Sequence, residues 1–148
     1  MPGIIVGVDG SEHSRQALDW AMREAAQHDV PLTVVAVHRV TVRPATEIYW
    51  PMPDYPDGTS PDEETVRKAV GGLVHDAATQ TGEPVPDVTV TVTTGNPAEE
   101  LVAASRDADM LVVGSHGTGG FASLLLGSVS SQVVHHAACP VVVVRPPR

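Results

Sequence analysis

Residues 110–128 read Met-Leu-Val-Val-Gly-Ser-His-Gly-Thr-Gly-Gly-Phe-Ala-Ser-Leu-Leu-Leu-Gly-Ser, an apolar run followed by a glycine-rich loop. Four of the seven residues from Gly114 to Gly120 are glycines, which let the backbone approach a ligand closely and adopt positive φ. Gly127 and Ser128 then open a helical segment, whose first N–H groups and positive dipole end suit an anion. Ser128 and Ser130 add hydroxyl donors. The stretch predicts a strand, a phosphate-binding loop and a helix.

Similar apolar runs lie on both sides of this stretch. Together with residues 110–113 they predict five strands, at residues 4–8, 32–37, 88–92, 110–113 and 141–144. Segments with helical periodicity separate them; the first carries Ala17, Leu18, Ala21, Met22, Ala25 and Ala26 on one face. This βαβαβαβαβ order predicts an α/β fold with a parallel sheet. The length of 148 residues predicts a single domain spanning residues 1–148.

Start signals mark two of the helices. Asn96 is the expected N-cap of the third helix, with Pro97 at its first position and Glu99 completing a capping box. The acidic run Asp62, Glu63, Glu64 suits the first turn of the second helix, where negative charge complements the helix dipole.

The third and fifth strands have the patterns of edge strands. Val88, Val90 and Val92 alternate with threonines, which predicts a half-exposed strand. Residues 141–144 are four valines, and an exposed apolar edge without charge is rare in monomers. We expect this strand to pair with a second copy and form a homodimer. The alternative is an interior strand covered on both sides.

Composition narrows the function classes. Nine Lys and Arg against 18 Asp and Glu give a net charge of −9, which argues against nucleic-acid binding. No apolar run approaches the roughly 18 residues of a membrane helix, and the N-terminus lacks the pattern of a signal peptide. The one cysteine, Cys139, excludes an internal disulfide. We therefore expect a cytoplasmic protein.

Asp9 ends the first predicted strand. In doubly wound sheets ligands bind outside the carboxyl ends of the strands, where the strand order reverses. If the first and fourth strands are neighbours, Asp9 faces the loop that begins at Gly114. There it could bind ribose hydroxyls or a divalent cation that bridges phosphates. The alternative is that Asp9, or Ser11 in its place, caps the first helix.

Common nucleotide motifs do not fit. The P-loop needs a lysine, and the only one in the chain is Lys68, in the second predicted helix. The turn after the first strand fits the Rossmann fingerprint poorly. A glycine-rich turn used only for tight packing therefore remains an alternative for residues 114–120.

At this point the sequence resembles the universal stress protein family. The resemblance runs from the opening residues 4–11 to residues 139–145. Its most specific part is the nucleotide motif of glycine, two residues, glycine, nine residues, then glycine and serine or threonine. Gly114, Gly117, Gly127 and Ser128 match this motif with its spacing intact.

The resemblance implies an open five-stranded parallel sheet in the order 3-2-1-4-5, with two helices on each face and dimers paired through the last strand. It also implies the ATP-binding branch of the family, with Asp9 at the ribose or phosphates. We expect Mg²⁺ to accompany ATP, and Asp9 is the residue that could bind it. The contacts that it implies with the nucleotide come from Asp9, Val37, His38, Arg39, Gly114, Ser115, His116, Gly117, Gly127, Ser128, Val129 and Ser130.

One departure affects ligand choice. Many relatives carry a basic residue where this chain has His116 or Thr118, so we expect weaker triphosphate binding here. Alternative ligands are cAMP or AMP, which need less charge neutralisation. Further alternatives are an interaction module that binds no nucleotide and a nucleotide hydrolase. We expect slow hydrolysis at most, because no general base or catalytic arginine is evident near the loop.

Two other features allow simpler interpretations. His135 and His136 are adjacent on a helix and point about 100° apart, so we expect no shared metal; His13 shows no helical relation to Asp9. Residues 43–61 hold five prolines and three of the five aromatic residues, namely Tyr49, Trp50 and Tyr55. We expect these aromatic residues to form either a lid that stacks on a base or an element that packs onto the dimer or the sheet edge.

Overall fold

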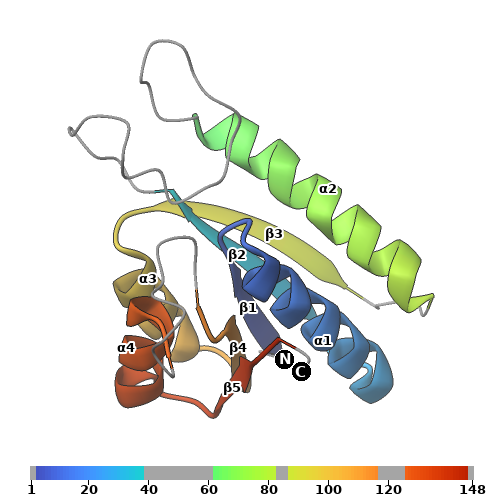
Figure 1. The fold of residues 1–148 in the computed structure, drawn as a ribbon. Coiled ribbons are helices and arrows are strands. Elements are labelled where there is room, and N and C mark those ends of the chain that lie inside the picture. The colour runs from blue at the N-terminus through green and yellow to red at the C-terminus, as the bar shows by residue number, and fades with distance from the viewer. Residues whose placement is uncertain (1–2, 39–61, 83–86, 117–125, 147–148) are drawn as a thin grey trace.

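The computed structural model describes residues 3–38, 62–82, 87–116 and 126–146 (Figure 1). Strands and helices alternate along these segments. Their bounds are β1 Ile4–Val8, α1 Glu12–His28, β2 Leu32–His38, α2 Glu63–Thr81, β3 Val88–Thr94, α3 Pro97–Ser105, β4 Met110–Gly114, α4 Ser128–His136 and β5 Val141–Val144. The predicted alternation is confirmed. Arg39, Gly117 and the aromatic residues Tyr49, Trp50 and Tyr55 lie outside the described residues.

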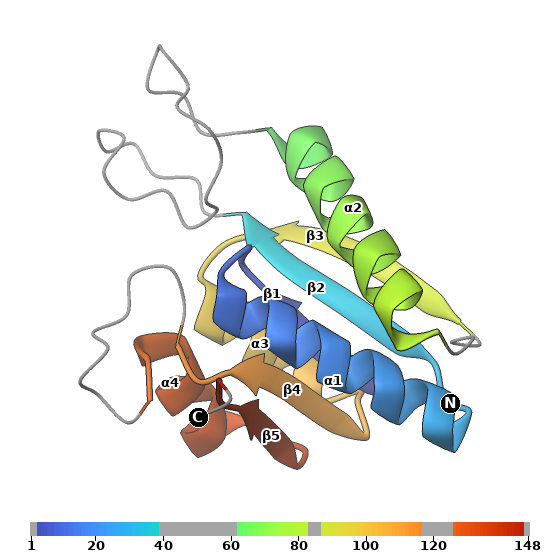
Figure 2. The ribbon, with the colours of Figure 1, turned by 45° about the vertical axis from the view of Figure 1, so that its right-hand side comes forward.

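The five strands form one sheet in the order β3-β2-β1-β4-β5, and every pair is parallel. The predicted order is therefore confirmed. β1 pairs with both β2 and β4, so the order reverses on the two sides of β1. Helices α1 and α2 cover one face of the sheet, and α3 and α4 cover the other (Figure 2).

Alternating side chains of the strands divide the core in two. Val6, Val34 and Val112 are fully buried on the α1 and α2 side, together with Leu18 and Met22 of α1. On the α3 and α4 side the buried cluster is smaller, made of Ile5, Val35, Leu101, Leu111, Val113 and Val133. Aliphatic side chains thus form the core, as the scarcity of aromatic residues requires.

Gly7 lets α3 approach the sheet closely. A Cβ at this position would lie 2.9 Å from Leu101 Cδ1, closer than carbon atoms pack. The glycine therefore fixes α3 directly over the carboxyl end of β1, which is where the candidate site is found.

Side chains cap three of the four helices. Ser11, Asp62 and Asn96 each accept a hydrogen bond from the N–H three residues later, at 3.2, 2.7 and 3.2 Å. Asn96 with Pro97 at the first helical position confirms the predicted start of α3. Helix α4 differs, because Gly127 is its N-cap and no side chain caps it.

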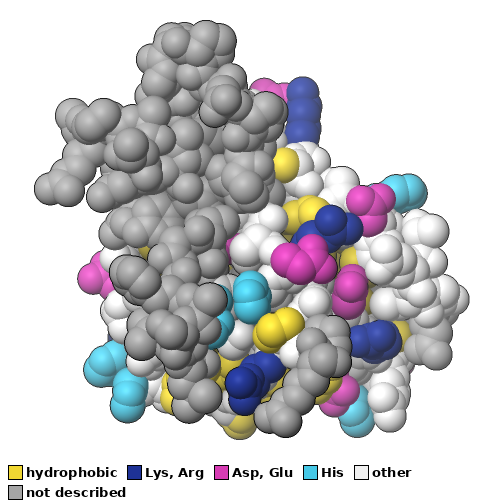
Figure 3. Space-filling view, in the orientation of Figure 1, with side chains coloured by type: hydrophobic (Ala, Val, Ile, Leu, Met, Phe, Trp, Pro, Cys, Tyr) yellow, Lys and Arg dark blue, Asp and Glu magenta, His cyan; other side chains and the backbone are white. Residues whose placement is uncertain are grey.

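Among the described residues, no helix combines the length and apolarity needed to cross a bilayer. On the face shown in Figure 3, Lys and Arg side chains are interspersed with Asp and Glu, so the described part of this face carries no continuous basic patch.

Candidate functional site

A cavity of about 60 Å³ lies where the carboxyl ends of β1, β2 and β4 meet the first turns of α1, α3 and α4. This is the point at which the strand order reverses, the usual ligand site of doubly wound sheets. Its lining consists of Gly7, Val8, Asp9, Ser14, Val35, Val37, Pro97, Leu101, Val113, Gly114, His116, Val129 and Ser130.

The cavity has an apolar side and a polar side. Val35 and Val37 of β2 and Leu101 of α3 line the apolar side, whereas Asp9 and His116 contribute polar groups. Small-molecule sites commonly combine an apolar wall with a few polar groups that orient the ligand. This arrangement can accept a flat apolar ring with hydrophilic substituents.

Asp9 and Ser11 share the turn that begins α1. The Asp9 carboxylate accepts the Ser11 N–H at 2.9 Å, and the Asp9 N–H donates to Ser14 Oγ at 3.3 Å. Ser11 is the N-cap, so of the two capping alternatives the structure selects Ser11. Asp9 organises this turn and lines the cavity as well.

Gly114, at the end of β4, lies against the first turn of α1. A Cβ at this position would be 2.7 Å from both the carbonyl carbon and the carbonyl oxygen of His13. Close packing therefore requires glycine here, which agrees with the alternative that the glycines of residues 114–120 serve tight packing. Because Gly114 also lines the cavity, both interpretations of this residue fit the structure.

Ser115 joins four elements while remaining 1% exposed. Its N–H donates to the Val144 carbonyl of β5 at 3.0 Å. Its carbonyl accepts from the Gly127 N–H at 2.6 Å and from Ser130 Oγ at 2.8 Å, both at the start of α4. Its hydroxyl lies between His13 of α1 and His116. Ser115 thus positions the elements around the cavity and is not part of its lining.

The N-terminus of α4 carries the donors expected for an anion. The first N–H groups of a helix have no intrahelical partner, and no side chain caps α4. Ser130 is 2% exposed and its hydroxyl donates to the Ser115 carbonyl, so this proton is used within the protein. The backbone of α4 is therefore the better source of donors.

The structure brings together half of the residues predicted for the site. The cavity lining includes Asp9, Val37, Gly114, His116, Val129 and Ser130, and does not include His38, Ser115, Gly127 or Ser128. Arg39 and Gly117 lie outside the described residues. The predicted contact of each with a ligand stays a prediction.

His38 is oriented away from the cavity. Alternation along β2 places Val35 and Val37 on the α3 side, so the His38 side chain faces the α1 and α2 side. Its carbonyl accepts the Gly95 N–H at 3.0 Å. A contact between the His38 carbonyl and a base would have to share this oxygen with the Gly95 N–H.

Sequence reasoning missed the pairing of His13 with His116. The two imidazole centroids lie 5.3 Å apart, with planes tilted by 59°. The signal was present in the predicted strand order, since the start of the helix after β1 adjoins the loop after β4 when these strands are neighbours. Helical spacing alone could not show it.

Shifted pKa values occur away from the cavity. Burial raises the pKa of the Cys139 thiol, with Asp109 adding to the shift, so the thiol stays protonated and poorly nucleophilic. Hydrogen bonds from Thr65 lower the pKa of Asp62 at the start of α2. Among the described residues, no three His, Cys, Asp or Glu side chains form a cluster that could hold a metal ion.

Curated relatives match nearly the whole chain. Universal stress protein Rv2005c of Mycobacterium tuberculosis is 39% identical over 144 residues, which cover 96% of this chain and 47% of that protein. Universal stress protein Rv2623 of the same species is 37% identical, covering 96% and 44%. The chain spans about half the length of these relatives.

Solved structures share the fold. UspA from Lactobacillus plantarum superposes with a TM-score of 0.68 at 23% identity, covering 97% of both chains. A universal stress protein in complex with cAMP has a TM-score of 0.67 at 26% identity, covering 96% of this chain and 94% of that one. A universal stress protein from Archaeoglobus fulgidus in complex with dAMP has a TM-score of 0.59 at 20% identity, covering 96% of both chains.

The family model described as "Universal stress protein family" matches residues 2–145. The strand order, the site at its reversal and the curated relatives agree with this match. The chain belongs to the universal stress protein family.

Proposed function

We propose that the chain binds an adenine nucleotide, first of all ATP with Mg²⁺, in the cavity at the end of β1. The observation that carries the proposal is the convergence of Asp9, Gly114 and the uncapped start of α4 around one apolar-walled cavity. The family member in complex with cAMP supports an adenine ligand, since it shares 26% identity with this chain.

Each part of the nucleotide has a matching group. Val37 and Leu101 provide the apolar wall for the adenine ring. The Asp9 carboxylate suits the ribose hydroxyls, which are hydrogen-bond donors. The backbone at Gly114 and the N–H groups of Ser128, Val129 and Ser130, in the first turn of α4, suit the phosphates. The N–H of Gly127 is bonded to the Ser115 carbonyl, so Gly127 would contribute close backbone approach.

The residues also fit a magnesium ion that arrives with the nucleotide. Mg²⁺ keeps several waters and typically uses one or two carboxylates together with phosphates. Asp9 is the carboxylate that lines the described cavity. Bound there, the ion would neutralise phosphate charge that this chain meets with few basic side chains.

A monophosphate ligand, AMP or cAMP, is the second candidate. The described lining includes no Lys or Arg, and its one carboxylate repels phosphate when no cation is present. A ligand with less charge avoids this cost. Calorimetric competition between MgATP and cAMP for the purified chain distinguishes the two ligands.

The proposed cellular role is a cytoplasmic stress-response module that signals through nucleotide occupancy as a homodimer. The proposed dimer contact is β5, where all four valines are only partly buried. A nucleotide-independent interaction module is the alternative. Full biological activity of a Gly117→Val, Gly127→Val double variant would favour that alternative.

The direct test is to denature the protein as purified and identify any released small molecule by mass spectrometry. Adenine nucleotide is the expected result. Calorimetry should then show that Asp9→Asn, which keeps an acceptor for the Ser11 N–H, binds MgATP about 10- to 100-fold more weakly. Asp76→Asn on exposed α2 is the matched control. Unchanged affinity of Asp9→Asn would remove Asp9 from the site, and a parent chain that binds no nucleotide would refute the proposal.

A further inference from the structure

One serine hydroxyl lies between two imidazole rings beside the cavity. Ser115 Oγ is 3.2 Å from His116 Nδ1 and 3.4 Å from His13 Nδ1. The three residues come from two places in the chain: His13 lies in the first turn of α1, and Ser115 and His116 are adjacent in the segment after β4. Ser115 is buried, and its backbone is held by β5 and α4, so the hydroxyl is fixed in place.

The hydrogen-bonding capacity of the hydroxyl restricts the two rings. A serine hydroxyl donates one proton, and a neutral imidazole has one N–H and one bare nitrogen. Among the described residues, the two Nδ1 atoms are the partners of Ser115 Oγ. The hydroxyl can donate only to a bare Nδ1 and can accept only from an Nδ1–H. Both contacts are hydrogen bonds when one ring carries its proton on Nδ1 and the other on Nε2. If both rings carried Nδ1–H, the hydroxyl could accept from both through its two lone pairs, but its own proton would have no acceptor among the described residues.

We infer that Ser115 holds His13 and His116 in complementary tautomers, with Nδ1–H on His13 and Nε2–H on His116. His116 lines the cavity together with the Asp9 carboxylate, and an anion nearby favours the tautomer that directs an N–H away from Ser115.

The inference gives His13 a positioning role. The His13 Nδ1–H donates to Ser115 Oγ, so the hydroxyl donates its own proton to Nδ1 of His116. His116 then carries its proton on Nε2. An Nε2–H is a donor to an anionic oxygen such as that of a phosphate, whereas the other tautomer would present a lone pair to it. This step rests on the proposed function, because it takes the ligand to be a phosphate-bearing nucleotide.

Nitrogen chemical shifts test the tautomers without any ligand. Long-range ¹H–¹⁵N spectra of the ¹⁵N-histidine-labelled chain, recorded at pH 8 where imidazoles are mostly neutral, should show Nδ1–H for His13 and Nε2–H for His116. His13→Gln and His116→Gln assign the signals. The same tautomer on both rings of the parent chain would overturn the inference, and this result needs no variant of Ser115.

The Ser115→Ala variant tests the bridge. It should release His13 from its Nδ1–H form, whereas the signals of His135 and His136 should not move, since these rings lie 6.3 Å apart in α4 as a separate pair. Ser115→Thr keeps the hydroxyl and should keep the parent pattern. An unchanged His13 tautomer in a folded Ser115→Ala chain would count against the bridge.

AMP is the probe for the positioning role. His13→Ala should weaken AMP binding about three- to tenfold, the range that one neutral hydrogen bond contributes. His13→Asn should restore part of it, because an amide N–H can replace Nδ1–H. The losses of His13→Ala and His116→Ala should not add. Additive losses, or equal affinity of His13→Ala and the parent, would exclude the positioning role. If the parent binds no AMP or ATP, the proposed function fails while the tautomer result still stands.

Discussion

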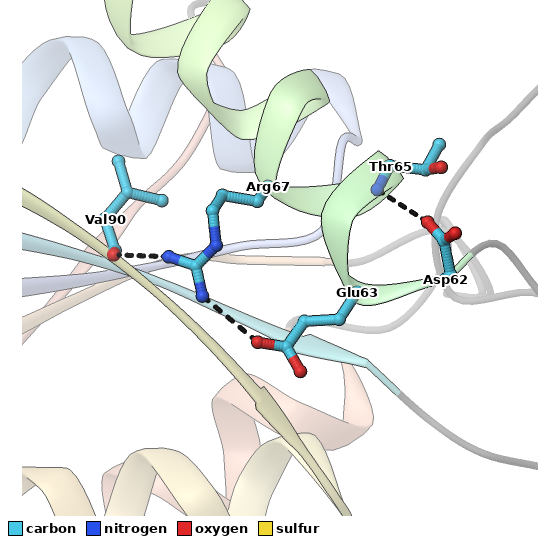
Figure 4. Close-up of polar contacts among 5 residues, drawn as sticks. All are labelled: Asp62, Glu63, Thr65, Arg67 and Val90. Atoms are coloured by element: carbon cyan, nitrogen blue, oxygen red, sulfur yellow. Dashed lines mark hydrogen bonds and ion pairs between the residues drawn. The ribbon is translucent and has the colours of Figure 1, made fainter.

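The two edge strands of the sheet, β3 and β5, differ in their exposed side chains and in the contacts along their outer edges. In β3 the exposed side chains are Thr89, Thr91 and Thr94, and the valines face inward. Arg67 of α2 donates to the Val90 carbonyl at 3.2 Å and pairs with Glu63 at 3.1 Å (Figure 4). In β5 all four residues are valines, and each is partly exposed.

The backbone explains why the Arg67 contact matters. The Asp87 carbonyl is directed toward β2, where it accepts the Leu32 N–H. Alternation then directs the Val90 carbonyl outward, where another strand could pair with it. Arg67 of α2 occupies this carbonyl, and charged side chains and covering elements at a sheet edge hinder such pairing. The difference between the edges therefore points to β5 as the edge available to a second copy, in agreement with the proposed homodimer.

The largest expected effect comes from breaking the β5 edge. The Pro140 and Val144 carbonyls are directed toward β4, so alternation directs the N–H of Val143 outward. Val143→Pro removes this donor and should raise the dimer dissociation constant about tenfold or more. Analytical ultracentrifugation measures the change. A parent chain that is monomeric at all concentrations would refute the dimer.

Val142→Pro is the matched control for that variant. Its N–H is directed toward β4, so the substitution should disrupt the sheet itself and lower the free energy of unfolding. If Val142→Pro and Val143→Pro lower the unfolding free energy equally, the inference that the Val143 N–H is directed away from β4 is wrong.

The regions next to the two edge strands should also differ in how far an added methyl group changes the free energy of unfolding. Gly114→Ala, beside β5, places a Cβ against the His13 backbone and should cost about 1–3 kcal/mol in the free energy of unfolding. Gly71→Ala in α2, near β3, meets no atom within 4 Å and should add about 0.5–1 kcal/mol. Urea denaturation measures both. A neutral Gly114→Ala would show that α1 can move away from β4.

Opening the β3 edge should have a smaller effect. Arg67→Ala removes the contact with Val90 and should lower the unfolding free energy by less than about 1 kcal/mol, since the ion pair is exposed. The change should show more clearly as concentration-dependent light scattering. Lys68→Ala is the control, because Lys68 pairs with Glu64 at 3.7 Å and has no bond to a strand in the part of the chain that the structure describes. Equal scattering from both variants would argue against edge protection.

The smallest effect concerns the cap of the same helix. Thr65 lowers the pKa of Asp62 below the ordinary 3.8, so its carboxylate favours the folded state above that pH. The stabilisation of the parent relative to Asp62→Asn should therefore be largest near neutral pH. It should disappear as the pH falls below 3.8 and through the lowered value. Thermal unfolding at pH 7 and pH 3 checks the sign, and a difference that grows in acid would contradict it.

The sequence predicted the strands and helices better than the side-chain contacts between them. The alternating valines and threonines of residues 88–93 identify an edge strand because side chains alternate in any strand. Asn96 identifies a helix start because its capping bond is local. The Arg67 contact with Val90 has no such signal, because its partner is a backbone carbonyl 23 residues away.

In the candidate site, too, some features could be predicted from the sequence and others could not. Asp9 and Gly114 could be predicted to meet because the ends of neighbouring parallel strands lie together. The burial of Ser115 and the bond that occupies the His38 carbonyl depend on tertiary contacts. Neither follows from residue type or spacing.

The bonds of Ser115 relate the proposed dimer to the proposed nucleotide binding. It bonds to Val144 at the end of β5 and to Gly127 at the start of α4, so one residue connects the proposed dimer edge with the proposed phosphate site. Where one binding equilibrium shifts another, thermodynamic linkage makes the effect reciprocal. If nucleotide strengthens the dimer by some factor, the dimer must bind nucleotide more tightly by the same factor. Apparent nucleotide affinity would then rise with protein concentration.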